Sequence, residues 1–249
     1  MLSKYSNSRT LMDNLRLGSL TAFSAGMTNI ASLLIFFSFS SNVTGYYAIL
    51  AAEIAKGDFF KSAVVMGWIF LFFFGGFVSN FIVIHFNQEN AYLAHATPLI
   101  IEICCLLGVG IYGQFFYEET LTETEILLAF MLFAMGLQNG LTASISNFSV
   151  KTTHLTGATT DLAILFSMFT KEEFRNNNDL VRRVKLLMTI FLSYVTGAIV
   201  SGILYFHIHF RVFYIVCSIL VVVILYDYSK IKVKLFRQKR ASFNTFEED

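Results

Sequence analysis

Six stretches of this sequence are apolar enough and long enough to cross a lipid bilayer as a helix. A spanning helix needs about 20 mostly apolar residues. In lipid, only helices and closed barrels satisfy their own backbone hydrogen bonds. The chain is also only 14% charged, against about a quarter in soluble domains. We therefore predict an all-α, polytopic membrane helix bundle, with spans at about 19–40, 63–86, 97–117, 126–148, 186–206 and 210–228.

Two further apolar stretches are shorter than a full span. They lie at about 43–55 and 155–169, and they are interrupted by Glu53 and Asp161 respectively. Apolar stretches of this length are more often re-entrant or interfacial helices. The sequence thus favours six spans plus two half-length helices, and the alternative of eight spans, in which both short helices cross, stays open.

Basic residues gather in three regions: before the first span, in the loop 170–185, and in the tail after Tyr228. Lys and Arg are retained on the cytoplasmic side of membranes. With six spans all three regions share one side, so we predict a multi-pass protein of the cell inner (plasma) membrane with cytoplasmic N- and C-termini. Lys56 and Lys61 then lie outside, whereas eight spans would return them inside. The charged N-terminal segment does not resemble a cleavable signal peptide.

The chain repeats itself at increasing offsets. Three paired motifs recur 110, 112 and 122 residues later: Gly26/Asn29 as Gly136/Asn139, Asn42/Gly45 as His154/Gly157, and Gly75/Ser79 as Gly197/Ser201. We interpret the chain as one membrane domain of two homologous halves, 17–117 and 126–228, followed by a basic tail, 229–249. Three spans per half would make the repeat inverted, as in many secondary transporters. Four spans per half would make the halves parallel.

Each short helix opens with a Thr-Gly pair after a polar break. Non-helical backbone at membrane depth must be buried in protein or line water, and a helix that starts there presents free N–H groups and the positive end of its dipole. We predict that both N-termini face a solute site; ordinary capping at the interface is the alternative. The predicted binding residues are Asn42, Thr44, Gly45, Gln138, Asn139, Thr156, Gly157 and Asp161.

Polar and ionisable side chains inside the apolar runs complete this candidate site. Gln138 and Asn139 point about 100° apart on a helix, so both cannot lie on one narrow seam, and one of them can face a cavity. Asp161 is expected to share the space that the Thr156-Gly157 helix opening faces. Glu102, after Thr97-Pro98, is expected near the interface at the start of its helix. Helix N-termini favour an anion, whereas Asp161 favours a cation or a proton. The sequence therefore leaves the sign of the solute's charge open.

No constellation for covalent catalysis, metal binding or a cofactor is visible in the sequence. The three cysteines lie inside apolar runs, and we interpret them as small core residues rather than as a disulfide or metal set. We therefore expect no catalytic residues, no metal and no cofactor. The expected partners are the lipid bilayer and a small polar solute or ion, without nucleic acid, and self-association into a homo-oligomer is left open.

The chain resembles the YoaK-type family of bacterial polytopic membrane proteins, whose domain has no known function. The resemblance covers about 17–228 and is carried by Ala25-Gly26, by Asn42-Val-Thr-Gly45, by Gly136-Leu-Gln-Asn139, and above all by Thr153-His-Leu-Thr-Gly157-Ala-Thr-Thr-Asp161-Leu162. Asn29 stands where many members have Asp, and Tyr46 where Asn is common. The resemblance implies an inner-membrane protein and no particular activity.

Three functional hypotheses follow from these patterns. The favoured one is a transporter or channel for a small polar solute, because the duplicated helix break lies beside buried polar groups. The second is a non-transporting membrane scaffold or partner subunit in which the same groups only pack helices. An intramembrane enzyme is the third, and it is the weakest because no catalytic set is visible.

Overall fold

The computed structural model describes Leu2 and residues 10–226, so the predicted tail 229–249 lies outside the described residues. The described part is all-helical and contains no strand, which confirms the all-α prediction. The elements, in chain order, are α1 (Leu11–Phe36), α2 (Val43–Lys56), α3 (Phe59–Phe115), α4 (Leu121–Ile145), α5 (Leu155–Met168), α6 (Glu172–Arg175), α7 (Asn178–Ile208), a 3₁₀ turn η2 (His209–Arg211), and a final helix over 212–226.

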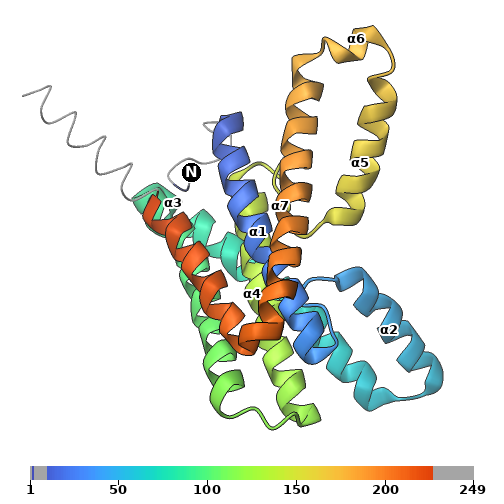
Figure 1. The fold of residues 1–249 in the computed structure, drawn as a ribbon, viewed down its shortest axis with the longest axis vertical. Coiled ribbons are helices and arrows are strands. Elements are labelled where there is room, and N and C mark those ends of the chain that lie inside the picture. The colour runs from blue at the N-terminus through green and yellow to red at the C-terminus, as the bar shows by residue number, and fades with distance from the viewer. Residues whose placement is uncertain (1, 3–9, 227–249) are drawn as a thin grey trace, which may run out of the picture.

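Four helical segments are long and apolar enough to cross a membrane, judged by length and composition: Leu11–Phe36, Phe59–Phe115, Leu121–Ile145 and Asn178–Tyr226. Two of them are too long for one crossing. At 1.5 Å per residue, the 57 residues of α3 would extend about 86 Å, against about 30 Å of hydrocarbon. The backbone of α3 leaves helical geometry at Asn90 (φ −152°, ψ 92°), and η2 interrupts the other segment. Figure 1 shows the chain reversing direction at both places.

The helix after Asn90 starts earlier than the sequence suggested. The Asn90 side chain accepts a hydrogen bond from the Leu93 N–H at 3.1 Å and caps this helix. Thr97 is not a cap, because its hydroxyl donates to the Leu93 carbonyl one turn back (2.8 Å), and Pro98 lies inside the helix. Glu102 is therefore about 18 Å into the helix. Its side chain is fully buried without a hydrogen-bond partner in the described part, so the expected position at the start of its helix is wrong.

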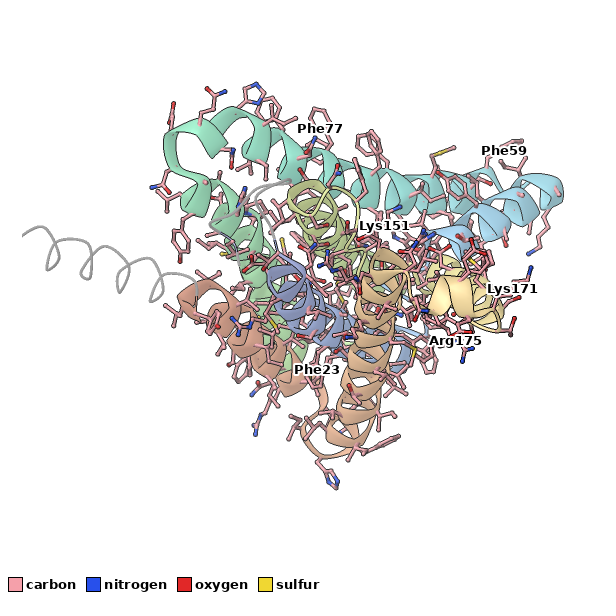
Figure 2. The ribbon with its side chains drawn as sticks, turned by 90° about the horizontal axis from the view of Figure 1, so that it is seen from above. Phe23, Phe59, Phe77, Lys151, Lys171 and Arg175 are labelled. Atoms are coloured by element: carbon pink, nitrogen blue, oxygen red, sulfur yellow. The ribbon has the colours of Figure 1, made fainter. Side chains whose placement is uncertain are left out.

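Aromatic side chains cover the outer side of the first half of α3. Phe59 and Phe77 are 76% and 54% exposed, and Figure 2 shows both on the outside of this helix. The rings of Phe70, Phe74, Phe77 and Phe81 stack along one face. A water-soluble monomer rarely exposes an apolar surface this continuous, so the face is suited to lipid.

Two close helix crossings form the centre of the bundle. In the first, between α1 and α7, Gly26 lies against the Tyr194 backbone and Gly197 against the Phe23 backbone. In the second, between α3 and α4, Gly75 and Gly136 lie against each other's helix backbone in the same way. A Cβ at any of the four would collide with main-chain atoms, so small residues allow this approach. Ser201 adds a hydrogen bond to the Met27 carbonyl at 2.8 Å across the first crossing.

α1 and α4 begin with the same local structure. Thr10 and Thr120 are N-caps, and each forms a capping box with the acid three residues later, Asp13 or Glu123. Each box satisfies two backbone N–H groups that the helix start leaves free. The two boxes are 110 residues apart, the same offset that separates Gly26 from Gly136.

The cysteines do not all lie in the core. Cys217 is buried, but Cys105 is only partly buried and Cys104 is exposed. The prediction of three core residues was therefore wrong for Cys104, because its helix face is turned to the outside of the bundle. All three thiols are free.

Candidate functional site

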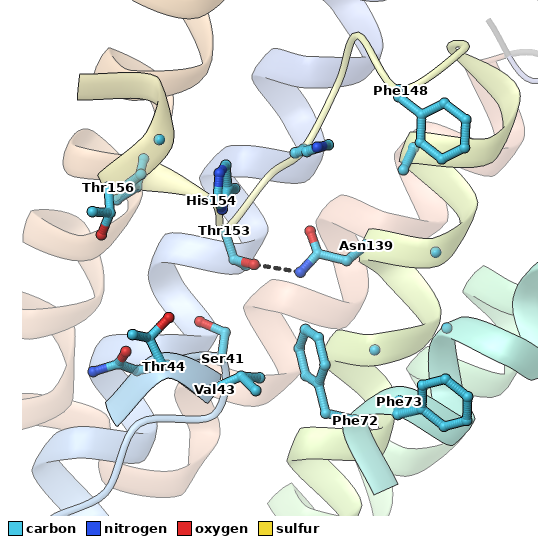
Figure 3. A pocket seen from close by; sticks show the side chains of 18 of the residues that line it. Ser41, Val43, Thr44, Phe72, Phe73, Asn139, Phe148, Thr153, His154 and Thr156 are labelled. Carbon is cyan, nitrogen blue, oxygen red and sulfur yellow. Dashed lines mark hydrogen bonds between the residues drawn. The ribbon is translucent and has the colours of Figure 1, made fainter. Parts of the chain in front are cut away.

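A cavity of about 1210 Å³ lies where the two short helices begin. Its walls come from α1 to α5, from Tyr194 of α7, and from the loops before α2 and α5. Of the predicted residues, the structure brings five into this wall: Asn42, Thr44, Asn139, Thr156 and Gly157. Figure 3 shows Thr44 and Thr156, each in the first turn of its short helix, with their hydroxyls turned toward one another.

The residue before each short helix folds over the glycine three positions later. The Asn42 side chain accepts a hydrogen bond from the Gly45 N–H at 3.2 Å and caps α2. His154 occupies the same position before α5 but forms no side-chain cap bond. Its imidazole lies where a Cβ on Gly157 would be. At both glycines an added Cβ would displace the side chain that covers the helix start.

An amide on a neighbouring helix positions each of the two loops. Asn139 of α4 donates to the Thr153 hydroxyl, as Figure 3 shows, and accepts from the Thr152 hydroxyl at 2.8 Å. Asn29 of α1 accepts from the hydroxyls of Ser41 and Ser40 at 3.0 and 3.3 Å. Two amides 110 residues apart thus hold the chain just before a short helix, by hydrogen bonds that involve the same kinds of group.

Asn29 also donates to the Tyr194 hydroxyl of α7 at 2.7 Å, which connects the first loop to the α1–α7 crossing. The position 122 residues earlier, Phe72, has no hydroxyl. Both aromatic rings line the cavity. The two sides of the site are therefore similar in backbone and different in chemistry.

Three predicted site residues lie outside the cavity wall. Gln138 instead donates to the Ser24 hydroxyl (2.7 Å) and the Thr21 carbonyl (3.2 Å) of α1, so Asn139 is the one of the adjacent pair that reaches the cavity. Gly45 contributes its N–H to the cap. Asp161 pairs with Arg183 of α7 at 2.8 Å. Five residues after Thr156, it points about 140° away around the helix, which corrects the prediction that its carboxylate shares the cavity.

Asp161 lines a second cavity of about 560 Å³ between the N-terminal part of α7 and α5. This second cavity shares four wall residues with the first: Phe148, Lys151, His154 and Gly157. Phe148 is 71% exposed and has a positive φ of 59°. Positive φ is strained for a bulky residue, and such strain concentrates at functional sites.

Four residues that were not predicted as site residues line the cavity: Lys151, Asn29, Asn80 and Tyr194. Asn80 of α3 accepts from Ser144 of α4 at 2.6 Å. Lys151 could have been found from the sequence, because it is the basic residue within the polar break before Thr156-Gly157. Within residues 10–226, His, Cys, Asp and Glu form no group of three or more that could hold a metal ion.

Residues 17–226 match the model of a family described as "Protein of unknown function (DUF1275)". Neither the curated proteins nor the solved structures contain a match to this chain. The YoaK-type resemblance is consistent with the family match, which covers almost the same residues.

Proposed function

The chain belongs to the DUF1275 family, and for this member we propose a transporter or channel that moves a small polar solute across the cell inner membrane. One observation carries the proposal: a cavity of about 1210 Å³ lies among apolar helices and is lined by polar groups from the first turns of both short helices. Binding sites built from discontinuous helices at mid-membrane depth are typical of secondary transporters. The proposal includes no enzymatic step.

We propose an inverted repeat for the architecture, with six crossings and two half-length helices. The two changes of direction, at Asn90 and at η2, support six crossings. The paired glycine crossings, capping boxes and amide–loop contacts support two equivalent halves. In Figure 1, α2 runs from the middle toward one end of the bundle and α5 toward the other, which favours opposite orientations of the halves.

The proposed topology places the N-terminus, the C-terminus and the loop 170–185 in the cytoplasm. Figure 1 shows α6 and the start of α1 at the same end of the molecule, and the turn between α3 and α4 at the opposite end. The two lysines that this topology places outside are both paired locally, Lys56 with Glu53 at 2.7 Å and Lys61 with Asp58 at 3.5 Å. These acids partly neutralise the misplaced positive charge.

The second candidate is a non-transporting scaffold or partner subunit. Two contacts favour this candidate: Asn29 donates to the Tyr194 hydroxyl, and the buried Gln138 donates to the Ser24 hydroxyl of α1. Such groups join helices by hydrogen bonds in many membrane proteins. This candidate does not account for the volume of the cavity, and a scaffold has no need of two helix N-termini there.

Uptake into proteoliposomes tests the proposal. The purified full chain is reconstituted, and a panel of neutral, cationic and anionic solutes is offered from outside, with mass spectrometry of the retained contents. We expect at least one class to enter above the rate of empty liposomes and to enter more slowly with Thr156→Val, which keeps the side-chain shape and removes the hydroxyl. Thr189→Val is the matched control, because Thr189 is a half-buried α7 threonine whose hydroxyl donates to the Lys185 carbonyl and which does not line the cavity. No uptake of any class would favour the scaffold.

A further inference from the structure

The charged groups around the cavity have one predominant sign. Among the described residues that line it, Lys151 is a cation and no Asp or Glu is present. Lys151 forms no ion pair or hydrogen bond with any described residue. The acid that the sequence placed in the site, Asp161, is paired with Arg183 and lies outside the wall.

The neighbouring 560 Å³ cavity carries the same sign. Its charged wall residues are Lys151, Arg182, Arg183 and Asp161, three cations and one anion. Because the two cavities share Phe148, Lys151, His154 and Gly157, Lys151 stands at the boundary between them. Lys151 is exposed at this boundary, where its positive charge raises the local concentration of anions and repels cations.

Several uncharged groups at this boundary can donate hydrogen bonds. His154 does not cap α5, so the first-turn N–H groups of Leu155, Thr156 and Gly157 have no acceptor among the described residues. The Thr44 and Thr156 hydroxyls line the same cavity (Figure 3). These donors and the positive end of the α5 dipole add to the charge of Lys151.

We infer that the cavity binds a small anion with a single negative charge, such as a halide, nitrate or a short carboxylate, and that Lys151 is its charge partner. The inference rests on the proposed function and names its substrate class. One lysine matches one negative charge, and the remaining donors replace part of the hydration shell of the ion. The 560 Å³ cavity is then the route by which the anion reaches Lys151 from the end of the bundle that carries α6.

Thermal unfolding of the full chain in detergent tests binding without transport. Sodium chloride, nitrate and lactate are titrated, and sodium gluconate holds the ionic strength constant. A ligand that binds the folded state raises the midpoint in a saturable way. We expect this rise in the wild type, an apparent affinity about tenfold weaker in Lys151→Gln, and retention in Lys151→Arg. Lys185→Gln is the control, because Lys185 is exposed on α7 and lines neither cavity.

Uptake of the same anions into proteoliposomes, with choline and erythritol as cationic and neutral probes, separates this inference from the proposed function. Uptake of an anion that falls in Lys151→Gln and not in Lys185→Gln supports both. A saturable, Lys151-dependent shift without uptake supports the anion site and removes the transporter. Uptake of choline or erythritol alone, without any saturable shift, overturns the anion site and keeps the transporter. Equal shifts of the unfolding midpoint in the wild type and in Lys151→Gln would indicate a general salt effect and would overturn the proposed anion site.

Discussion

Gly157 is the residue at which the geometry of the candidate site is tightest. The His154 imidazole occupies the place of a Cβ, so Gly157→Ala must displace that ring. We expect a destabilisation of about 1–2 kcal/mol, as for other overpacked sites. In a His154→Ala background the same change should stabilise by about 0.5–1 kcal/mol, because Ala is the better helix residue. Thermal or denaturant unfolding of the four chains measures this cycle, and equal effects in both backgrounds would rule out the contact.

Asn139 makes a second prediction at this scale. Thr152 is fully buried, and its hydroxyl donates to the Asn139 side chain at 2.8 Å. Asn139→Leu leaves that hydroxyl without its acceptor, which should cost about 1–3 kcal/mol of the free energy of unfolding and slow uptake by loosening the loop before α5. The double variant with Thr152→Val should recover most of the stability. A double variant as unstable as Asn139→Leu alone would contradict the assigned hydrogen bond.

The position of Asp161 in the sequence suggested a role in solute binding, but the structure leads us to expect little effect from its neutralisation. Its carboxylate pairs with Arg183, and the two side chains are 40% and 59% exposed. Exposed ion pairs contribute about 0–1 kcal/mol, so Asp161→Asn should change stability little. It also leaves the second cavity more positive, so anion uptake should persist or rise. A loss of uptake with unchanged stability would return Asp161 to the solute path.

At the scale of the elements, the kink in α3 is the feature most open to test. The Asn90 side chain caps the helix that follows, at 3.1 Å from the Leu93 N–H. Asn90→Ala should destabilise by about 1 kcal/mol, and Asn90→Ser should restore most of it, since both Asn and Ser are good N-caps. Thr97→Ala is the control and should be nearly silent, because its hydroxyl only bonds back to the Leu93 carbonyl. A larger loss at Thr97 than at Asn90 would place the helix start where the sequence suggested.

This helix also shows how far the sequence could predict the elements. The apolar stretch 97–117 was predicted because hydropathy marks the part of a helix in lipid, but the helix itself begins near Asn90, in a polar segment. Thr97-Pro98 looked like a helix start because Pro favours the first helical position. In the structure, Pro98 is tolerated inside the helix. Local propensity could not reveal a cap seven residues upstream.

The candidate site was predictable to the extent that it depends on local sequence. The polar break and the Thr-Gly pair identified both helix starts, and the 100° rule separated Gln138 from Asn139. The placement of Asp161 depends on which face of α5 meets α7, and that is set by tertiary packing. The role of Lys151 depends on two cavities meeting at a loop, which no spacing in the sequence encodes.

At the scale of the whole molecule, the proposed topology makes the final prediction. In a chain whose native cysteines are replaced by Ala, single cysteines are placed at Asn176 beside α6, at Glu119 between α3 and α4, and at Gly57 after α2. With six crossings and cytoplasmic termini, a membrane-impermeant maleimide should label Glu119→Cys and Gly57→Cys in intact cells. Asn176→Cys should react only in inverted vesicles, because the basic loop 170–185 is retained inside. Labelling of both Gly57→Cys and Glu119→Cys from the inside alone would mean that α2 crosses the membrane, because the two crossings of α3 keep these positions on one side, and it would replace the inverted repeat by parallel halves.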